Sequence, residues 1–366
     1  MIRGLTRALD NLFGRGDAAV TVPPLDGALR PNRVLDEATS RMALDGADCL
    51  AVRGETLFAS AGDSLFALGP DGTWEQRSSH RETIAGLCPV GEDGLAIALA
   101  DGRILIEGGR FDGRSYRAGE GTACITALAA NGSKLYVANG SATNAADDWQ
   151  RDLLERNASG SVWCIDLAGG AITRIADGLA WPAGLVVDGN GLVVSEAWKH
   201  RLVRIDPSRP GSNAVLHGDL PGYPGRIGPA QDGYWLALFA PRSQLVEFVL
   251  REDAYRKRMM AEVPQQFWVA PKLRSGRSFY ESLQGGGVKQ LGMLKPWAPT
   301  MSAGLCVKLD RGFQPRFSLQ SRADGRTHGV TCVAEYREQV FVTARGDGVI
   351  VSLPIADPTR AGGDTQ

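Results

Sequence analysis

The sequence lacks an excess of either charge and lacks any long apolar run. Its 40 Lys and Arg residues are balanced by 41 Asp and Glu residues, which leaves a net charge of −1. Such a balance gives no general attraction for nucleic acid or for an anionic membrane. No stretch approaches the roughly 18 apolar residues of a membrane span, and the N-terminus lacks the apolar core of a signal peptide. We therefore expect a cytoplasmic protein that does not bind nucleic acid.

Cysteine is sparse and lacks the spacing of a metal or redox motif. The six cysteines are Cys49, Cys88, Cys124, Cys164, Cys306 and Cys332. None forms a CxxC pair, and none lies near a histidine at zinc-finger spacing. Most of them stand inside apolar runs, so the pattern predicts small buried side chains rather than disulfides or nucleophiles.

The N-terminal segment, residues 1–22, has a pattern of its own. Within residues 2–15 apolar side chains recur at helical spacing, and three arginines occupy other positions. This pattern predicts a short amphipathic helix. Such a helix either packs on the protein itself or makes a peripheral membrane contact.

One pattern recurs six times along the remaining chain. Each copy has an apolar strand, a turn with Gly, Asp or Asn, and a second apolar strand. The second strands begin near Leu57, Leu95, Leu135, Leu192, Tyr234 and Val340. The unit of about 40 residues is typical of a propeller blade. We predict an all-β fold: a six-bladed β-propeller over residues 23–356, followed by a tail at 357–366.

Helical patterns interrupt this repeat in two places. We expect insertions at about 140–159 and 251–300, with helices over 144–156 and 252–263. Residues 243–250, just before the second insertion, are predicted to form strand at the end of the fifth copy. Residues 272–300 are poorly periodic and rich in Gly, Ser, Lys and Arg, which is typical of a long surface excursion.

Several stretches follow a known family in order. They are PPLDGALRPNRVLDEA at 23–38, GSVWCIDLAGGAITRIADGL at 160–179, LAWPAGLVVDGNGLVVSEAWKHRLVRIDP at 179–207, and DLPGYPGRIGPAQDGYWLAL at 219–238. In these the sequence resembles the strictosidine synthase-like six-bladed propellers. That group includes the adipocyte plasma membrane-associated proteins and, more distantly, the paraoxonases and gluconolactonases. The resemblance implies a small-molecule site in a central channel, where the distant relatives use a divalent cation, usually calcium, to hydrolyse lactones or esters.

The chain departs from that family at the expected cation ligands. An acid remains at Asp48, but Ala183 and Gly225-Arg226 stand where the resemblance implies amide and carboxylate oxygens. A guanidinium would repel a divalent cation by several kcal/mol. We therefore expect no cofactor and a lost calcium site. Thr331 stands at the acid position of the strictosidine synthases, and a hydroxyl cannot replace a carboxylate base, so we do not expect that activity.

The remaining polar residues of the inner strands are the candidate site. We assign catalytic roles to Asp48, Arg226 and His328. In this interpretation Asp48 pairs with Arg226 across the channel, Arg226 binds a carboxylate or an oxyanion, and His328 is the general base. The candidate substrate-binding residues are Asn139, Trp181, Ala183, Tyr223 and Thr331. In the alternative interpretation, Asp48 and Arg226 form a structural ion pair that closes the channel, and His328 is a turn residue.

Two functions stay open at this point. The first is a hydrolase-like propeller that acts on a small ester, lactone or related metabolite without the family metal. The alternative is a non-catalytic propeller that binds a small molecule or acts as a scaffold, with membrane association through residues 2–15. Whether the protein is an enzyme is not decided by the sequence.

Overall fold

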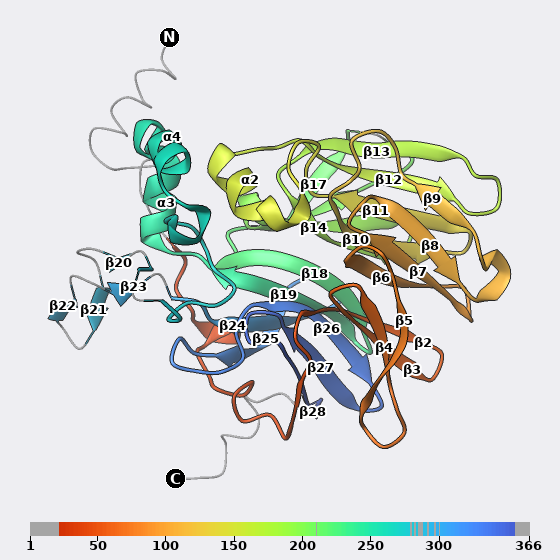
Figure 1. The fold of residues 1–366 in the computed structure, drawn as a ribbon, viewed down its shortest axis with the longest axis horizontal. Coiled ribbons are helices and arrows are strands. Elements are labelled where there is room, and N and C mark those ends of the chain that lie inside the picture. Colours follow the sequence, from red (N-terminus) through yellow and green to blue (C-terminus); the bar gives the residue numbers. More distant parts are fainter. Residues whose placement is uncertain are drawn as a thin grey trace.

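The computed structural model describes residues 22–355 except 210, 279, 282, 285–287, 291, 292, 296, 297 and 300. Six antiparallel sheets of four strands each are arranged around a central axis, which confirms the predicted six-bladed β-propeller (Figure 1). The predicted helix over 2–15 and the tail at 357–366 lie outside the described residues. In the described part of the chain, no helix is long and apolar enough to cross a membrane.

The blades follow one another in chain order. Blade one has β2 (Ala47–Arg53), β3 (Thr56–Ala61), β4 (Ser64–Leu68) and β5 (Trp74–Ser79). Blade two has β6 (Ile84–Val90), β7 (Gly94–Leu99), β8 (Arg103–Glu107) and β9 (Ser115–Arg117). Blade three has β10 (Ile125–Asn131), β11 (Lys134–Asn139), β12 (Gly160–Asp166) and β13 (Ile172–Leu179).

Blades four to six follow the same plan. Blade four has β14 (Pro182–Asp188), β15 (Gly191–Glu196), β16 (Arg201–Ile205) and β17 (Asn213–His217). Blade five has β18 (Gly222–Ala230), β19 (Gly233–Pro241), β24 (Gly304–Leu309) and β25 (Pro315–Ser321). Blade six has β26 (Val330–Tyr336), β27 (Gln339–Ala344), β28 (Val349–Pro354) and β1 (Ser40–Ala43).

The ring closes through its last blade. Strand β1, from the start of the described chain, pairs antiparallel with β28 near its end, with Ser40 opposite Ser352 and Ala43 opposite Val349. Blade six therefore joins both ends of the propeller. This pairing satisfies the edge of β28 and lets every blade face lie against a neighbour.

The core lies between the blades. Every residue of β7 is buried, because both faces of that strand pack against adjacent sheets. Such strands read as continuous apolar runs rather than as alternating ones. The outer strand β5 has no fully buried residue. Burial is therefore greatest in the second strand β7, lower in the innermost strand β6, which has one exposed and one half-buried residue, and lowest in the outer strand.

Three α-helices of the described residues lie at one end of the blades (Figure 1). Helix α2 (Trp149–Glu155) follows the 3-10 turn η4 (Ala146–Asp148), and α3 (Gln244–Arg251) is followed by α4 (Asp253–Glu262). The prediction of strand at 243–250 was wrong. Ser243 caps α3, its Oγ accepting from the Val246 N–H at 3.2 Å, and Val246 and Val249 form a buried helical stripe.

The insertion after β19 therefore begins at residue 242, earlier than the predicted 251. After α4 it contains the 3-10 turn η6 (Gln265–Phe267) and four short strands. These are β20 (Leu283–Gln284), β21 (Val288–Gln290), β22 (Met293–Lys295) and β23 (Ala298–Pro299). The described residues form three further 3-10 turns, η2 (Gly27–Leu29), η3 (Gly109–Phe111) and η5 (Ala197–Lys199).

Candidate functional site

Each of the six inner strands is interrupted by a β-bulge or register shift near its start. In β6, for example, Ile84 pairs with Leu99 and Gly86 with Ala98, which leaves Ala85 without a partner in the ladder. The corresponding breaks are in the other five inner strands. A bulge locally re-aims the side chain of the extra residue. The residues in the breaks that line one pocket together are Asp48, Ala85, Thr126, Ala183, Gly225, Arg226 and Thr331. Cys49, also in the break of β2, lines a different pocket.

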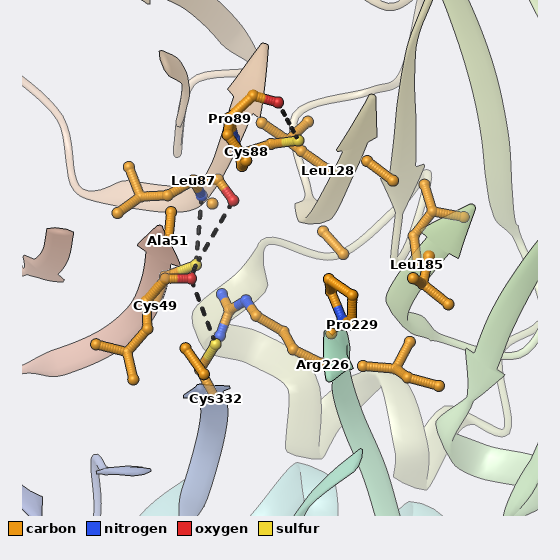
Figure 2. Close-up of a pocket in the computed structure, with 18 of the residues that line it drawn as sticks. Cys49, Ala51, Leu87, Cys88, Pro89, Leu128, Leu185, Arg226, Pro229 and Cys332 are labelled. Carbon is orange, nitrogen blue, oxygen red and sulfur yellow. Dashed lines mark hydrogen bonds between the residues drawn. The ribbon is translucent and has the colours of Figure 1, made fainter. Parts of the chain in front are cut away.

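These bulged residues surround what we call the mouth pocket, a space of about 130 Å³ at the end of the channel that carries α2. A second space of about 350 Å³ is lined by later residues of the same six strands. We call it the thiol cavity, because Cys49, Cys88 and Cys332 are in its wall (Figure 2). Arg226 lines both spaces, so its side chain lies at the boundary between them.

A buried ion pair forms that boundary. Arg226 Nη2 lies 2.7 Å from Asp48 Oδ2 and donates also to the carbonyl oxygen of Ala85 at 2.8 Å. Arg226 Nη1 donates to the backbone oxygen of Asp48 at 3.2 Å. The guanidinium of blade five is thereby fixed to blades one and two. The pairing of Asp48 with Arg226, which both interpretations of the sequence include, is thus present in the fold.

Further groups hold Asp48 in place. Its backbone oxygen accepts from the Thr331 hydroxyl at 2.8 Å and from the Thr343 hydroxyl at 3.2 Å. Arg345 Nη1 lies 3.7 Å from Asp48 Oδ1, and its Nη2 lies 3.4 Å from Asp147. Arg345 is thus a second cation beside the same carboxylate.

The charges of this pair are stable near neutral pH. Burial by itself would raise the pKa of Asp48, but the guanidiniums of Arg226 and Arg345 outweigh it and hold that pKa below its usual value. Burial would likewise lower the pKa of Arg226, and the Asp48 carboxylate reverses that effect and raises it. A carboxylate with a depressed pKa is a weak general base.

Aromatic side chains form much of the wall of the mouth pocket. Trp149 from α2 packs edge-on against Phe239, with ring centroids 5.4 Å apart, and Trp181 stacks on Trp198 at 5.1 Å. Trp149, Trp181 and Phe239 line the pocket together with Leu273. An aromatic wall above a charged floor suits a small flat molecule with one polar group.

Of the eight predicted site residues, five line this pocket. They are Asp48, Trp181, Ala183, Arg226 and Thr331. Sequence reasoning missed Thr126 and Ala85, although both occupy the same place in their repeats as Asp48 does in the first. It also missed Phe239 in β19, Arg345 directly after β27, and Asp147 and Trp149 in the insertion with η4 and α2. The position of these residues over the channel depends on the closed ring.

Three predicted residues lie elsewhere and do not line the mouth pocket or the thiol cavity as the described residues define them. Asn139 is buried, accepts from the Cys124 N–H at 3.0 Å and donates to the oxygens of Gly121 and Ser141. It thereby holds the loop before β10. Tyr223 is buried among aromatic rings, and its hydroxyl has no hydrogen-bond partner within the described residues.

His328 is fully buried in a polar network just before β26, the first strand of blade six. Its Nδ1 lies 2.7 Å from Ser302 Oγ and 2.6 Å from Arg274 Nη1, and its Nε2 lies 2.8 Å from the oxygen of Arg322. Burial, helped by Arg274, lowers the pKa of His328. Both ring nitrogens are occupied, so the geometry gives no support to its predicted role as general base.

The residues present do not fit the calcium site that the family resemblance implies. The six bulged positions supply one carboxylate, which is already paired with a guanidinium at 2.7 Å. Calcium takes six to eight oxygen ligands. Among the described residues, no group of three or more His, Cys, Asp or Glu side chains is placed to hold a metal ion.

Comparisons with known proteins identify the fold alone. The sequence matches no protein-family model, and no curated protein matches it. The luciferin-regenerating enzyme superposes with a TM-score of 0.52 at 11% sequence identity, covering 86% of this chain and 94% of that chain. A calcium-binding protein, regucalcin from Agrobacterium tumefaciens, gives a TM-score of 0.49 at 13% identity, covering 91% of this chain and 95% of that chain. The chain shares the six-bladed β-propeller fold with the luciferin-regenerating enzyme.

Proposed function

We propose that this protein is a strictosidine synthase-like propeller that binds a small, flat, largely apolar molecule in the mouth pocket. The observation that carries the proposal is the pocket itself, with aromatic walls over a floor closed by the Asp48–Arg226 pair. The pair occupies the positions where the resemblance implies a cation. Binding therefore depends on the protein's own guanidiniums rather than on a metal.

Arg345 is the group best placed to contact a ligand's polar end. Its side chain is 40% exposed, and its contacts to Asp48 and Asp147 are 3.7 and 3.4 Å long. These distances are too long for strong hydrogen bonds. A carboxylate or carbonyl oxygen on the ligand would give this guanidinium a shorter contact than either aspartate does. We therefore expect a preference for an aromatic acid over the neutral aromatic compound.

Fluorescence titration tests this function, because Trp149 and Trp181 both line the pocket. Indole-3-acetate should quench tryptophan emission and bind more tightly than indole. Trp149→Ala should weaken binding about tenfold, as expected for loss of one aromatic contact. Trp74→Ala, on the outer strand β5, is the matched control and should bind normally. Equal losses in both variants, or equal affinity for the two compounds, would contradict the proposal.

Hydrolysis of a small ester or lactone is the second candidate function. Two guanidiniums, Arg226 and Arg345, lie at the floor of one pocket, and such groups stabilise an oxyanion. The low pKa of Asp48 argues against efficient base catalysis by that carboxylate. Aryl-ester and lactone turnover measured with EDTA and with added calcium decides the point. Turnover in EDTA that is lost in Arg345→Gln would support hydrolysis without the metal, whereas calcium-dependent turnover would contradict our assignment of the pair.

A further inference from the structure

The thiol cavity, at the other end of the channel, contains chemistry that the mouth pocket does not use. We propose that Cys49 is a nucleophilic thiol that forms covalent adducts with small, apolar α,β-unsaturated carbonyl compounds entering this cavity. The inference does not depend on the function proposed for the mouth pocket. It rests on the cavity, on the contacts of the Cys49 sulfur, and on an unpaired donor nearby.

The cavity is large enough for a small organic molecule and is open at its rim. Its volume is about 350 Å³, and Pro89 and Pro229 at its edge are exposed. Its walls are mostly aliphatic and include Leu50. Leu87, Leu128 and Leu185 belong to the same walls (Figure 2). Apolar walls favour an apolar ligand.

The sulfur of Cys49 accepts a hydrogen bond from the backbone. The Leu87 N–H donates to Cys49 Sγ at 3.3 Å, a shorter contact than those from Sγ to the oxygens of Leu50 and Leu87, at 3.9 and 4.0 Å. Donation to the sulfur favours the thiolate. A thiolate, rather than a thiol, is the nucleophilic form of cysteine.

A second thiol and a cation also favour the thiolate form of Cys49. The sulfurs of Cys49 and Cys332 both contact the carbonyl oxygen of Leu50, at 3.9 and 3.7 Å, so the two thiols are neighbours in the wall. The neighbouring Cys332 thiol and the charge of Arg226, acting against burial, lower the pKa of Cys49 to about 7. The pKa of Cys332 is raised by the same contact. Cys88 differs, because burial raises its pKa to about 12.

Arg226 supplies a donor that lacks an acceptor. Its Nε is buried and has no hydrogen-bond partner in the described part of the chain, while its Nη groups hold Asp48 and Ala85. A buried donor without a partner is costly and calls for an explanation. The carbonyl oxygen of a bound unsaturated ketone would provide the missing acceptor. This feature selects a carbonyl compound over a simple hydrocarbon.

The reaction is an addition in which all atoms are retained. Cys49 first loses its proton to solvent, and the thiolate sulfur then forms a bond to the β-carbon of the unsaturated carbonyl compound. The C=C π electrons shift to form a double bond between the α-carbon and the carbonyl carbon, and the C=O π electrons move to the oxygen, giving an enolate beside Arg226. The α-carbon then takes up one proton from solvent. The product is a thioether, and nothing is oxidised or reduced.

Alkylation of the native protein with cyclohex-2-enone tests the proposal. Near pH 7 about half of a thiol with pKa 7 is ionised, against about 1% of one with pKa 9, and the lower intrinsic reactivity of the more acidic thiolate leaves a net advantage of about fivefold. We expect Cys49 to be modified at least about fivefold faster than Cys164, the half-buried cysteine of β12. Peptide mapping of the unmutated chain measures both rates. The rate at Cys49 should rise with pH through a midpoint near 7.

Matched variants locate the adduct. Cys49→Ser should lose the fast modification, and Cys88→Ser, altered in the same cavity, should keep it; circular dichroism verifies that both variants fold. Cys332→Ala should keep the adduct but move the pH midpoint upward, because the neighbouring thiol that favours the Cys49 thiolate is then absent. Modification of Cys49 only after denaturation, or at the rate of Cys164, would overturn the proposal.

Discussion

The two ends of the channel are built by the same six strands but differ in chemistry. At the mouth pocket the charged groups are paired with one another under aromatic walls, whereas the thiol cavity is aliphatic and contains thiols. Asp48 and Cys49 are neighbours in sequence, yet one belongs to each space. The bulge in β2 permits this, because Asp48 and Cys49 lie between the paired residues Ala47 and Leu50. A one-residue irregularity thus separates two environments.

The difference teaches how one set of inner strands can form two pockets of different chemistry. Bulges occur in all six inner strands and direct side chains to a common point. The side chains at these bulges set the chemistry of that point. Here an arginine and an aspartate close the channel, and they lie between the two pockets.

Breaking the Asp48–Arg226 pair should have the largest effect on this arrangement. Asp48→Asn leaves the guanidinium of Arg226 buried without its counter-charge, and loss of one partner of a buried pair typically costs about 3–5 kcal/mol. Urea denaturation measures the change in the free energy of unfolding. The double variant Asp48→Asn/Arg226→Met is the control and should recover much of the loss. If the double variant instead loses as much free energy of unfolding as the two single substitutions added together, Asp48 and Arg226 do not stabilise each other.

Lowering the pH should reduce the free energy of unfolding by less than breaking the Asp48–Arg226 pair does. The pKa of Asp48 is depressed in the folded state, so the stabilisation by its carboxylate is complete above the unfolded pKa of about 3.9. It is lost as the pH falls through the lower, folded pKa. The urea midpoints of the unmutated protein and Asp48→Asn should therefore converge below about pH 4. A difference that stays constant from pH 7 to pH 3 would contradict this assignment.

The repeat predicted the fold because each blade carries its own local signal. Apolar strands and glycine turns recur at a fixed spacing, and that pattern needs no long-range information. The strand predicted at 243–250 failed because an apolar run of that length fits both a strand and a buried helix. Ser243 as a helix cap was the local signal that could have corrected it.

The site was predictable only in part, for a physical reason. Asp48, Ala183, Arg226 and Thr331 were found because they stand at the inner-strand positions where the family resemblance implies site residues. His328 and Asn139 also lie near strand ends. Their side chains form hydrogen bonds within the protein, and the spacing of residues along the sequence does not predict those bonds. The thiol pair of Cys49 and Cys332 was read as ordinary core. The two residues are 283 positions apart, and only closure of the ring brings them together.

Of the variants considered, Arg345→Gln should change the free energy of unfolding least. It should also alter ligand binding in the mouth pocket without altering alkylation in the thiol cavity. Its ion pairs are long and its side chain is 40% exposed, so its removal should cost less than about 1 kcal/mol. Because this guanidinium lines only the mouth pocket of the two spaces described, affinity for indole-3-acetate should fall toward that for indole. The alkylation rate at Cys49 should stay the same, because Arg226 still lies between the pockets. A fall in both the affinity for indole-3-acetate and the alkylation rate at Cys49 would mean that the Asp48–Arg226 pair had moved. The mouth pocket and the thiol cavity would then act as one site.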